Sequence, residues 1–461
     1  MVDFKGLEEA ASFVKAGNRF TVIGHYDADG ITASAIAGQM LKRMKKRFDI
    51  VTTKQLDEER LKRLKKLEGD LIFVDIGSGT ISDLEELLPD KNICVIDHHK
   101  PEKRQSNFIV FNPHLFGYDG SNDVSGAGMT YFVAREVDER NKDLSKIAIV
   151  GAVGDMQDSK GRLLSLNREI LADGESVSEI ESKIDIRLFG RQSRPLVKFL
   201  SYSSDPFLPG LTADDEACKR FIKSLGIPLY RDNKWLHYVD LSDDEKRRFI
   251  SALYVYGRKN GVPDAVLKTL VGEVYELVKE KERTELRDAK EFATLLNACG
   301  RHDKAMLGVE ICMGDRGEAY RKASNLLQRH RKMLRDGIEW VQKHGVKEMK
   351  YIYVIDASYV IKDTLIGVIS GMLYGASVVR RDKPVIGISV DNEGVMKISS
   401  RANWELVRKG LDLGKVMREA AESVGGTGGG HNIAAGASIR PEKKEQFLKK
   451  ANELVREQLF R

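Results

Sequence analysis

The 461-residue sequence predicts an α/β protein in three parts: a parallel-sheet domain at 1–165, a helical insertion at 166–345 and a smaller α/β domain at 346–461. Strand-like and helix-like segments alternate in the first part, which is typical of βαβ units. The second part carries periodic apolar residues between charges, and alternation returns in the third. A chain of this length also exceeds what one hydrophobic core usually supports.

The most informative element is the stretch 21–30, TVIGHYDADG. Residues 19–24 are apolar and β-rich, whereas 31–44 repeat apolar residues at the spacing of one helix face. His25, Asp27 and Asp29 are therefore expected on a strand-to-helix turn. In open α/β sheets, ligands bind in the crevice beyond the carboxyl ends of the strands. A turn whose acids merely cap the helix is the alternative for this motif alone.

Three further apolar segments, at 70–78, 91–100 and 147–158, also bring acids or imidazoles to their ends. The residues are Asp75, Asp97, His98, His99 and Asp155. Four such endings are hard to assign to packing or turn chemistry. Carboxylate and imidazole ligands without a thiolate favour Mn²⁺ or Mg²⁺ over a structural zinc. Two such ions about 3.5–4 Å apart can activate water and clamp both oxygens of an in-line phosphoryl displacement.

Taken in order, these motifs resemble the DHH phosphoesterase superfamily, named for the triplet that appears here as Asp97-His98-His99. HxDxDG at 25–30, the second-strand Asp75, the triplet and the Gly-Asp pair at 154–155 follow its four motifs. The stretch GGTGGGHNIAAG at 425–436 resembles the GGGH signature of the DHHA1 domain. Segments 194–210 and 292–312 are similar to archaeal RecJ-like members, the nucleases associated with GINS or with Hef.

The resemblance implies two Mn²⁺ ions, with Mg²⁺ as the alternative. His25 and Asp27 would bind the first ion, and Asp29, His98 and Asp155 would bind the second. Asp75 would bridge the two ions. In the triplet, Asp97 would orient an imidazole and His99 would face the scissile phosphate. The implied substrate-binding residues are Arg401, Gly428, Gly429, Gly430 and His431.

The activity implied is a single-strand-specific exonuclease that hydrolyses DNA or RNA to mononucleotides in a cleft between the DHH and DHHA1 domains. Its setting would be DNA repair or replication, with a repair helicase or a replication-fork complex as partner, and we expect a homo-oligomer. The alternative is a phosphodiesterase for short oligonucleotides or cyclic dinucleotides. The insertion favours a polymeric substrate, because small-substrate relatives usually have a short linker there. A scaffold that has lost its ligands is the non-enzymatic alternative, but every motif ligand is present.

Composition adds weaker expectations. The net charge of +6 permits a polyanionic partner without requiring one. Four widely spaced cysteines without a CxxC motif are expected to be reduced and buried. No apolar stretch is long enough to cross a membrane, and the amino-terminal segment lacks the core of a signal peptide. A cytoplasmic protein without membrane attachment is therefore expected.

Several local patterns make separate predictions. Small residues at 125–128 either let backbone amides approach a phosphate or begin a helix packed on the sheet. Ser242 and Glu245 predict a capping box, and helices are expected at 265–281 and 316–343. Basic residues crowd the second of these helices, as a solvated face or a phosphate track. The third part predicts a helix at 363–374, a hairpin within 384–403 and a helix from 441.

Overall fold

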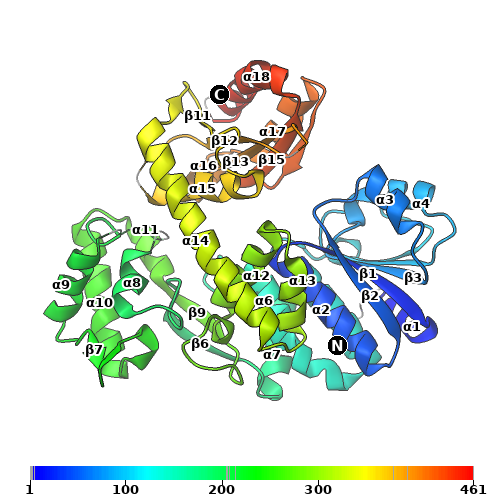
Figure 1. Cartoon of the computed structure of the whole chain (residues 1–461), viewed down its shortest axis with the longest axis horizontal. Helices are drawn as coiled ribbons and strands as arrows, with labels where there is room; N and C mark the ends of the chain where they lie inside the picture. The colour runs from blue at the N-terminus through cyan, green and yellow to red at the C-terminus, as the bar shows by residue number, and fades with distance from the viewer. Residues whose placement is uncertain are drawn as a thin grey trace. The chain divides into compact units, whose positions relative to one another are not determined.

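The structure is a computed structural model that describes residues 4, 6–203, 206, 208–212, 214–376, 378–391 and 393–459. The segment 194–210 thus includes residues 204, 205 and 207, which lie outside the described residues. The chain divides into two compact units, Met1–Leu327 and Gln328–Arg461 (Figure 1). Each unit has its own hydrophobic cores. The α/β class predicted from the sequence is confirmed, with a parallel sheet, a helical middle region and a mixed sheet.

The first unit is built on a five-stranded parallel sheet in the order β2-β1-β3-β4-β5. Its strands are β1 (Arg19–His25), β2 (Arg47–Thr53), β3 (Asp70–Val74), β4 (Ile93–Ile96) and β5 (Ile109–Phe111). The central strands are buried on both faces, which explains their nearly continuous apolar sequences. Register aligns Val22 of β1 with Ile72 of β3, and Ile72 with Cys94 of β4.

Helices cover both faces of this sheet. One core joins Val22, Ile72 and Cys94 to α1 (Leu7–Ala16), α2 (Ala28–Arg43), α5 (Gly126–Val137) and α6 (Ser145–Gly154). The other joins the alternate residues Ile23 and Phe73 to α3 (Glu58–Leu64) and α4 (Ile81–Leu87). Because successive side chains of a strand point to opposite faces of the sheet, each central strand contributes residues to both cores. Short 3₁₀ helices lie at Ser78–Thr80, Pro113–Leu115 and Glu139–Leu144.

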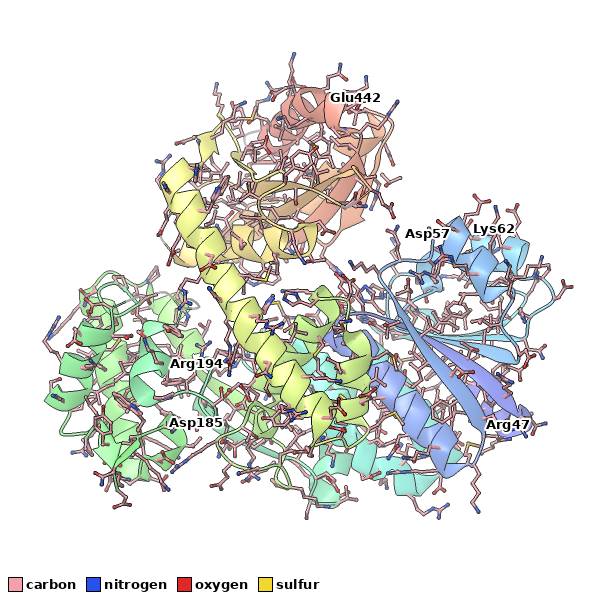
Figure 2. All side chains as sticks on the ribbon, viewed as in Figure 1. Arg47, Asp57, Lys62, Asp185, Arg194 and Glu442 are labelled. Atoms are coloured by element: carbon pink, nitrogen blue, oxygen red, sulfur yellow. The ribbon has the colours of Figure 1, made fainter. Side chains whose placement is uncertain are left out.

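The middle region is largely helical, and its part at 186–270 has a core of its own. Its helices are α7 (Leu166–Ser176), α8 (Leu196–Ser201), α9 (Asp215–Ser224), α10 (Asp243–Lys259), α11 (Asp264–Leu267), α12 (Ala289–Arg301) and α13 (Ala305–Cys312). Two small antiparallel pairs join β6 (Glu181–Ile186) to β9 (Val271–Glu276) and β7 (Tyr230–Arg231) to β8 (Lys234–Trp235). Asp185 of β6 and Arg194, labelled in Figure 2, belong to this region. Further 3₁₀ turns lie at Tyr238–Asp240, Lys268–Leu270 and Glu285–Arg287.

The capping box of α10 is confirmed, because Glu245 N donates to Ser242 Oγ and Ser242 N donates to the Glu245 carboxylate. The helix expected at 265–281 is wrong: α11 ends at Leu267, and β9 follows. The strand forms because it pairs with β6, more than 80 residues earlier, aligning Glu181 with Glu276. A local apolar period cannot reveal a partner so distant in sequence.

The helix expected at 316–343 is confirmed as α14 (Glu318–His344). Tyr320 packs against the first core, and Trp340 packs against a core of the second unit. Its basic side chains are exposed or half-buried, as a solvated face requires, and the phosphate track stays a prediction. These side chains are Arg321, Lys322, Arg329, Arg331, Lys332 and Arg335.

The second unit contains a mixed six-stranded sheet in the order β10-β11-β12-β13-β15-β14. Its strands are β10 (Lys347–Glu348), β11 (Tyr353–Asp356), β12 (Val385–Val390), β13 (Met396–Arg401), β14 (Thr427–Gly430) and β15 (Ala434–Ile439). The parallel pair β11–β12 is joined by α15 (Asp363–Gly375), and β12–β13 is the expected hairpin. The remaining helices are α16 (Trp404–Arg408), α17 (Leu413–Glu422) and α18 (Lys444–Leu459), preceded by a 3₁₀ turn at Pro441–Lys443.

All four cysteines are free thiols. Cys94, Cys218 and Cys299 are buried, whereas Cys312 is only half-buried. Burial raises the pKa of the Cys94 thiol to about 12, which keeps it protonated and inert. Among the described residues, the helices are too short or too polar to span a bilayer.

Candidate metal centre

The carboxyl ends of β1, β3 and β4 form the edge of the first sheet where the predicted ligands gather. β1 ends on His25, while Asp75 and Asp97 directly follow β3 and β4. Because β1, β3 and β4 are neighbouring parallel strands, these ends open on one edge. The other predicted metal-site residues come from adjoining elements: Asp27, Asp29, His98, His99 and Asp155.

The strand-to-helix turn after β1 is confirmed, and it reconciles the two interpretations of its acids. Asp27 caps α2, since its Oδ1 accepts a hydrogen bond from Gly30 N at 3.1 Å. Its Oδ2 lies 3.0 Å from Nδ1 of His25. One carboxylate therefore caps the helix with one oxygen and faces the imidazole with the other.

Asp155 follows a helix, not a strand. The apolar run from residue 147 belongs to α6, and Asp155 is its C-terminal cap. An apolar run of this length fits a buried helix as well as a buried strand, so its sequence leaves the type of element open. The helix packs among α2, α5 and α12, and its end lies at the same sheet edge.

The side chains form three overlapping groups of potential ligands: one joins Asp75 to Asp97, His98 and His99, and the other two form adjacent ligand sets. One ligand set is His25, Asp27 and Asp75; the other is Asp29, His98 and Asp155. Within each set, one ligand atom from each residue lies within 4.8 Å of the others. Asp75 faces both sets: Oδ2 lies 3.6 Å from His25 Nδ1, and Oδ1 lies 3.2 Å from His98 Nε2. A single carboxylate thus presents a different oxygen to each set.

The chemistry of this edge fits a divalent cation. Asp75 is 1% exposed, and its two oxygens have no hydrogen-bond partner besides the imidazoles of His25 and His98 that face them. An unsatisfied buried polar group costs about 1–3 kcal/mol, and more when it is charged. Asp75 also holds a left-handed backbone conformation, with φ of 58°, which is uncommon for a non-glycine residue. Oxygen and imidazole donors in this arrangement constitute a divalent-metal site.

The electrostatics of the site reflect crowded negative charge. Burial raises the pKa of Asp29, and the neighbouring Asp75 carboxylate raises it further. Burial also raises the pKa of Asp155 to about 6, against the opposing pull of His98. Burial alone would lower the pKa of His98, but Asp155 and Asp75 outweigh it and raise that pKa well above its ordinary value. Without a cation, protons therefore neutralise part of the charge.

Asp97 serves the site through hydrogen bonds. Its Oδ2 accepts from Ser78 N at 2.9 Å, and its Oδ1 accepts from His98 N at 2.7 Å and from His99 N at 3.2 Å. The same Oδ1 lies 2.9 Å from Nδ1 of His99. With these donors in place, the carboxylate orients the His99 ring, whose side chain is 44% exposed.

The small residues at 125–128 begin a helix, and their amides bind a carboxylate of the site itself. Ser125 caps α5, while Gly126 N and Ala127 N donate to the two oxygens of Asp29 at 2.7 and 3.0 Å. The phosphate-cradle interpretation of this segment is therefore wrong, because these two amides are already occupied. They hold Asp29 at the N-terminus of α5, where a helix dipole favours negative charge.

The structure adds residues that the sequence analysis did not single out. Asn297 Oδ1, on α12, accepts a hydrogen bond from Ala28 N at 3.0 Å and so fixes the start of α2. Arg301, at the end of α12, lies beside Tyr26 and Asp27: burial lowers its pKa, and these two neighbours oppose the shift. Both lie within the segment 292–312, which resembles archaeal RecJ-like members in sequence, and that resemblance did not indicate these contacts.

The predicted substrate residues belong to the second unit. Arg401 ends β13 and aligns with Ala434, and Ala402 N donates to Ile433 O at 2.9 Å. This pairing places Arg401 beside the β14–β15 turn that carries His431, whose N donates to Ala434 O. The sheet therefore brings Arg401 and His431 to one end.

The glycine run at 428–430 forms the edge strand β14. A side chain at Gly428 would meet the Met417 carbonyl of α17 at 2.4 Å, and Gly430 has φ of 135°. At Gly429, a side chain would meet nothing within 4 Å. Close packing of α17 therefore accounts for Gly428, backbone conformation accounts for Gly430, and Gly429 borders open space.

Comparison with protein families assigns three segments. Residues 19–154 match the DHH family, N-terminal domain; 188–271 match the DHH-CID domain; and 358–457 match the DHHA1 domain. An uncharacterized protein of Methanocaldococcus jannaschii is 33% identical over 449 residues, covering 95% of this chain and 94% of that protein. The single-stranded-DNA-specific exonuclease RecJ of Thermus thermophilus is 28% identical over 204 residues, covering 41% of this chain and 30% of RecJ.

Solved structures agree on the fold. RecJ of T. thermophilus in complex with Mn²⁺ has a TM-score of 0.62 at 18% identity, covering 99% of this chain and 55% of RecJ. CDC45 of Entamoeba histolytica has a TM-score of 0.65 at 14% identity, covering 98% of this chain and 99% of CDC45. The chain thus spans about half of the T. thermophilus RecJ structure. With its ordered motifs and its two ligand sets, the chain belongs to the DHH phosphoesterase family and combines DHH, DHH-CID and DHHA1 domains.

Proposed function

We propose that this protein is a two-metal exonuclease that hydrolyses single-stranded DNA or RNA to mononucleotides, of the archaeal RecJ-like type. The observation that carries the proposal is the Asp75 carboxylate, which presents one oxygen to each of two ligand sets and has no other hydrogen-bond partner. Two divalent ions, Mn²⁺ or Mg²⁺, would supply Lewis acidity to activate water and to stabilise charge on the phosphoryl oxygens.

The protein's own groups would position the reacting atoms. The amides at the start of α5 hold Asp29, and the Asp97 carboxylate holds the His99 ring by its Nδ1 side. The Nε2 side of His99 is then left to contact a phosphoryl oxygen. Because these supports are in place before substrate binds, little reorganisation is needed during the reaction.

The substrate class is supported by three features. The segment similar to the single-stranded-DNA-specific exonuclease RecJ covers 41% of the chain. The DHH-CID domain enlarges the middle region beyond a simple linker. Arg401 and the glycine-rich turn with His431 share one end of the DHHA1 sheet and are proposed to bind the strand. We propose repair or replication as the setting, with a repair helicase or replication-fork complex as partner.

The test is product analysis with Mn²⁺ on single-stranded DNA and RNA labelled at either end, beside a dinucleotide. Mononucleotides released progressively from one labelled end are expected, because an exonuclease acts from a terminus. Asp75→Ala should abolish this release. Asp83→Ala, which removes an exposed carboxylate on α4, is the matched control and should retain it.

The remaining outcomes decide among the alternatives. Cleavage of the dinucleotide alone would overturn the exonuclease in favour of a small-substrate phosphodiesterase. Internal fragments would indicate an endonuclease. If the protein binds Mn²⁺ and strands but cuts neither substrate, the scaffold interpretation replaces the enzymatic one.

A further inference from the structure

Behind the second ligand set lies a closed ring of hydrogen bonds that includes Gln157, two residues after Asp155. Gln157 is 3% exposed, which is unusual for a glutamine. Its Nε2 donates to Asp155 Oδ2 at 2.9 Å and to the Gly120 carbonyl at 2.8 Å. Both partners accept only, so the amide nitrogen must face them, and both of its hydrogens are used.

The same Gly120 carbonyl also contacts His98. Nδ1 of His98 lies 2.7 Å from this oxygen. Since a carbonyl accepts and cannot donate, Nδ1 must carry the proton, which leaves Nε2 as the nitrogen that faces Asp75 and Asp29. Gly120 must lack a side chain, because a Cβ there would lie 1.8 Å from the His98 carbonyl oxygen. One carbonyl thus sets the tautomer of His98 and anchors Gln157.

Asn167 closes the ring from α7. It is fully buried, and its Nδ2 donates to Gln157 Oε1 at 2.6 Å, while its backbone N donates to Asp123 O at 3.0 Å. Asp123 in turn accepts from Asp119 N at 2.8 Å, in the loop that presents Gly120. Each member is therefore held from two sides, and Gln157 has one orientation that satisfies all of its partners.

We propose that Gln157 is a positioning residue that aligns Asp155 and His98 for one of the two metal ions and leaves the other ion's ligands untouched. This inference rests on the proposed two-metal function. Residues that support metal ligands from behind typically change metal affinity about 10- to 100-fold when replaced. The geometry makes the effect asymmetric, because Gln157 contacts Asp155 and shares a partner with His98.

The test is calorimetric titration of metal-free protein with Mn²⁺, comparing the wild type with Gln157→Met. Methionine keeps the length of the side chain and removes the donor. Two ions are expected to bind the wild type; in the variant, one should bind about 10- to 100-fold more weakly and the other unchanged. Excess Mn²⁺ should restore kcat, which a loss of folded structure would not allow. Gln446→Met, the same change at an exposed site of the second unit, is the control and should bind as wild type.

Asn167→Ala provides a second route, because it releases Gln157 without touching a ligand and should weaken the same ion to a smaller extent. It decides the question if Gln157→Met does not fold. Unchanged affinity for both ions in the variants that fold would overturn the proposal, as would equal weakening of both. A wild type that binds no Mn²⁺ would instead refute the metal site on which the proposed function rests.

Discussion

Nδ1 of His99 lies 2.9 Å from Oδ1 of Asp97, and this contact makes the aspartate of the triplet a support for its second histidine. Asp97→Asn is expected to lower kcat about 10- to 100-fold, because the amide cannot accept all of the hydrogen bonds that the carboxylate now accepts. Mn²⁺ affinity should change little. Steady-state kinetics beside calorimetry check this, and a parallel loss of metal binding would contradict it.

Gly126→Ala tests how closely α5 approaches the Asp75 carboxylate. A Cβ at Gly126 would lie 2.6 Å from both Cβ and Oδ1 of Asp75, so the carboxylate must move. A displacement near 1 Å at a catalytic group costs about 100-fold in rate, which is the expected loss of kcat.

Gly79→Ala is the matched control for this change, since its Cβ would meet nothing within 4 Å. It should retain wild-type activity. Wild-type kcat in Gly126→Ala would show that Asp75 does not need its present position.

Mn²⁺ should stabilise the folded protein. At a free concentration of 100 times Kd, each ion contributes about 2.7 kcal/mol, because it binds the native ligand sets and not the unfolded chain. Thermal unfolding with and without Mn²⁺ measures this shift, and EDTA should reverse it. Asp75→Ala should lose most of the shift, and Asp83→Ala should keep it.

The buried Arg191 predicts a pH-dependent stability. Its Nη1 lies 2.6 Å from Asp185 Oδ2 and its Nε lies 3.2 Å from Asp288 Oδ2, while its Nη2 pairs with Glu276. Arg191→Met leaves these buried carboxylates without that cation, so the free energy of unfolding should fall by about 3–5 kcal/mol at pH 7.

The sign of the pH effect follows from Glu276. Burial would raise its pKa, but Arg191 and Lys183 outweigh burial and lower it. A lowered pKa contributes stability above the unfolded-state value, and that stability is lost as pH falls through the folded-state value. In Arg191→Met, Glu276 loses the neighbour that lowers its pKa most, so the difference in the free energy of unfolding between wild type and variant should shrink from pH 7 to pH 4. Urea unfolding between pH 4 and pH 7 checks this prediction. A constant difference in the free energy of unfolding between the variant and the wild type would refute it.

Much of the fold and site could be predicted because their signals are local. Strand β1, the turn at 25–30 and the capping box of α10 each involve residues within a few positions of one another. The misreadings arose where the decisive contact is distant. Residues 271–276 form a strand because β6 lies beside them, and the amides of Gly126 and Ala127 are occupied because Asp29, nearly 100 residues earlier, reaches them.

The sequence by itself determined which metal-ligand types occur, their order along the chain, and their expected gathering at the carboxyl ends of parallel strands. Those properties follow from residue identity and from the period of neighbouring apolar residues. Only the tertiary structure decided which oxygen of Asp75 faces which ligand set, that Asp155 ends a helix, and that Gln157 and Gly120 stand behind Asp155 and His98. These relationships depend on packing between segments far apart in the chain, and the local sequence does not encode such distances.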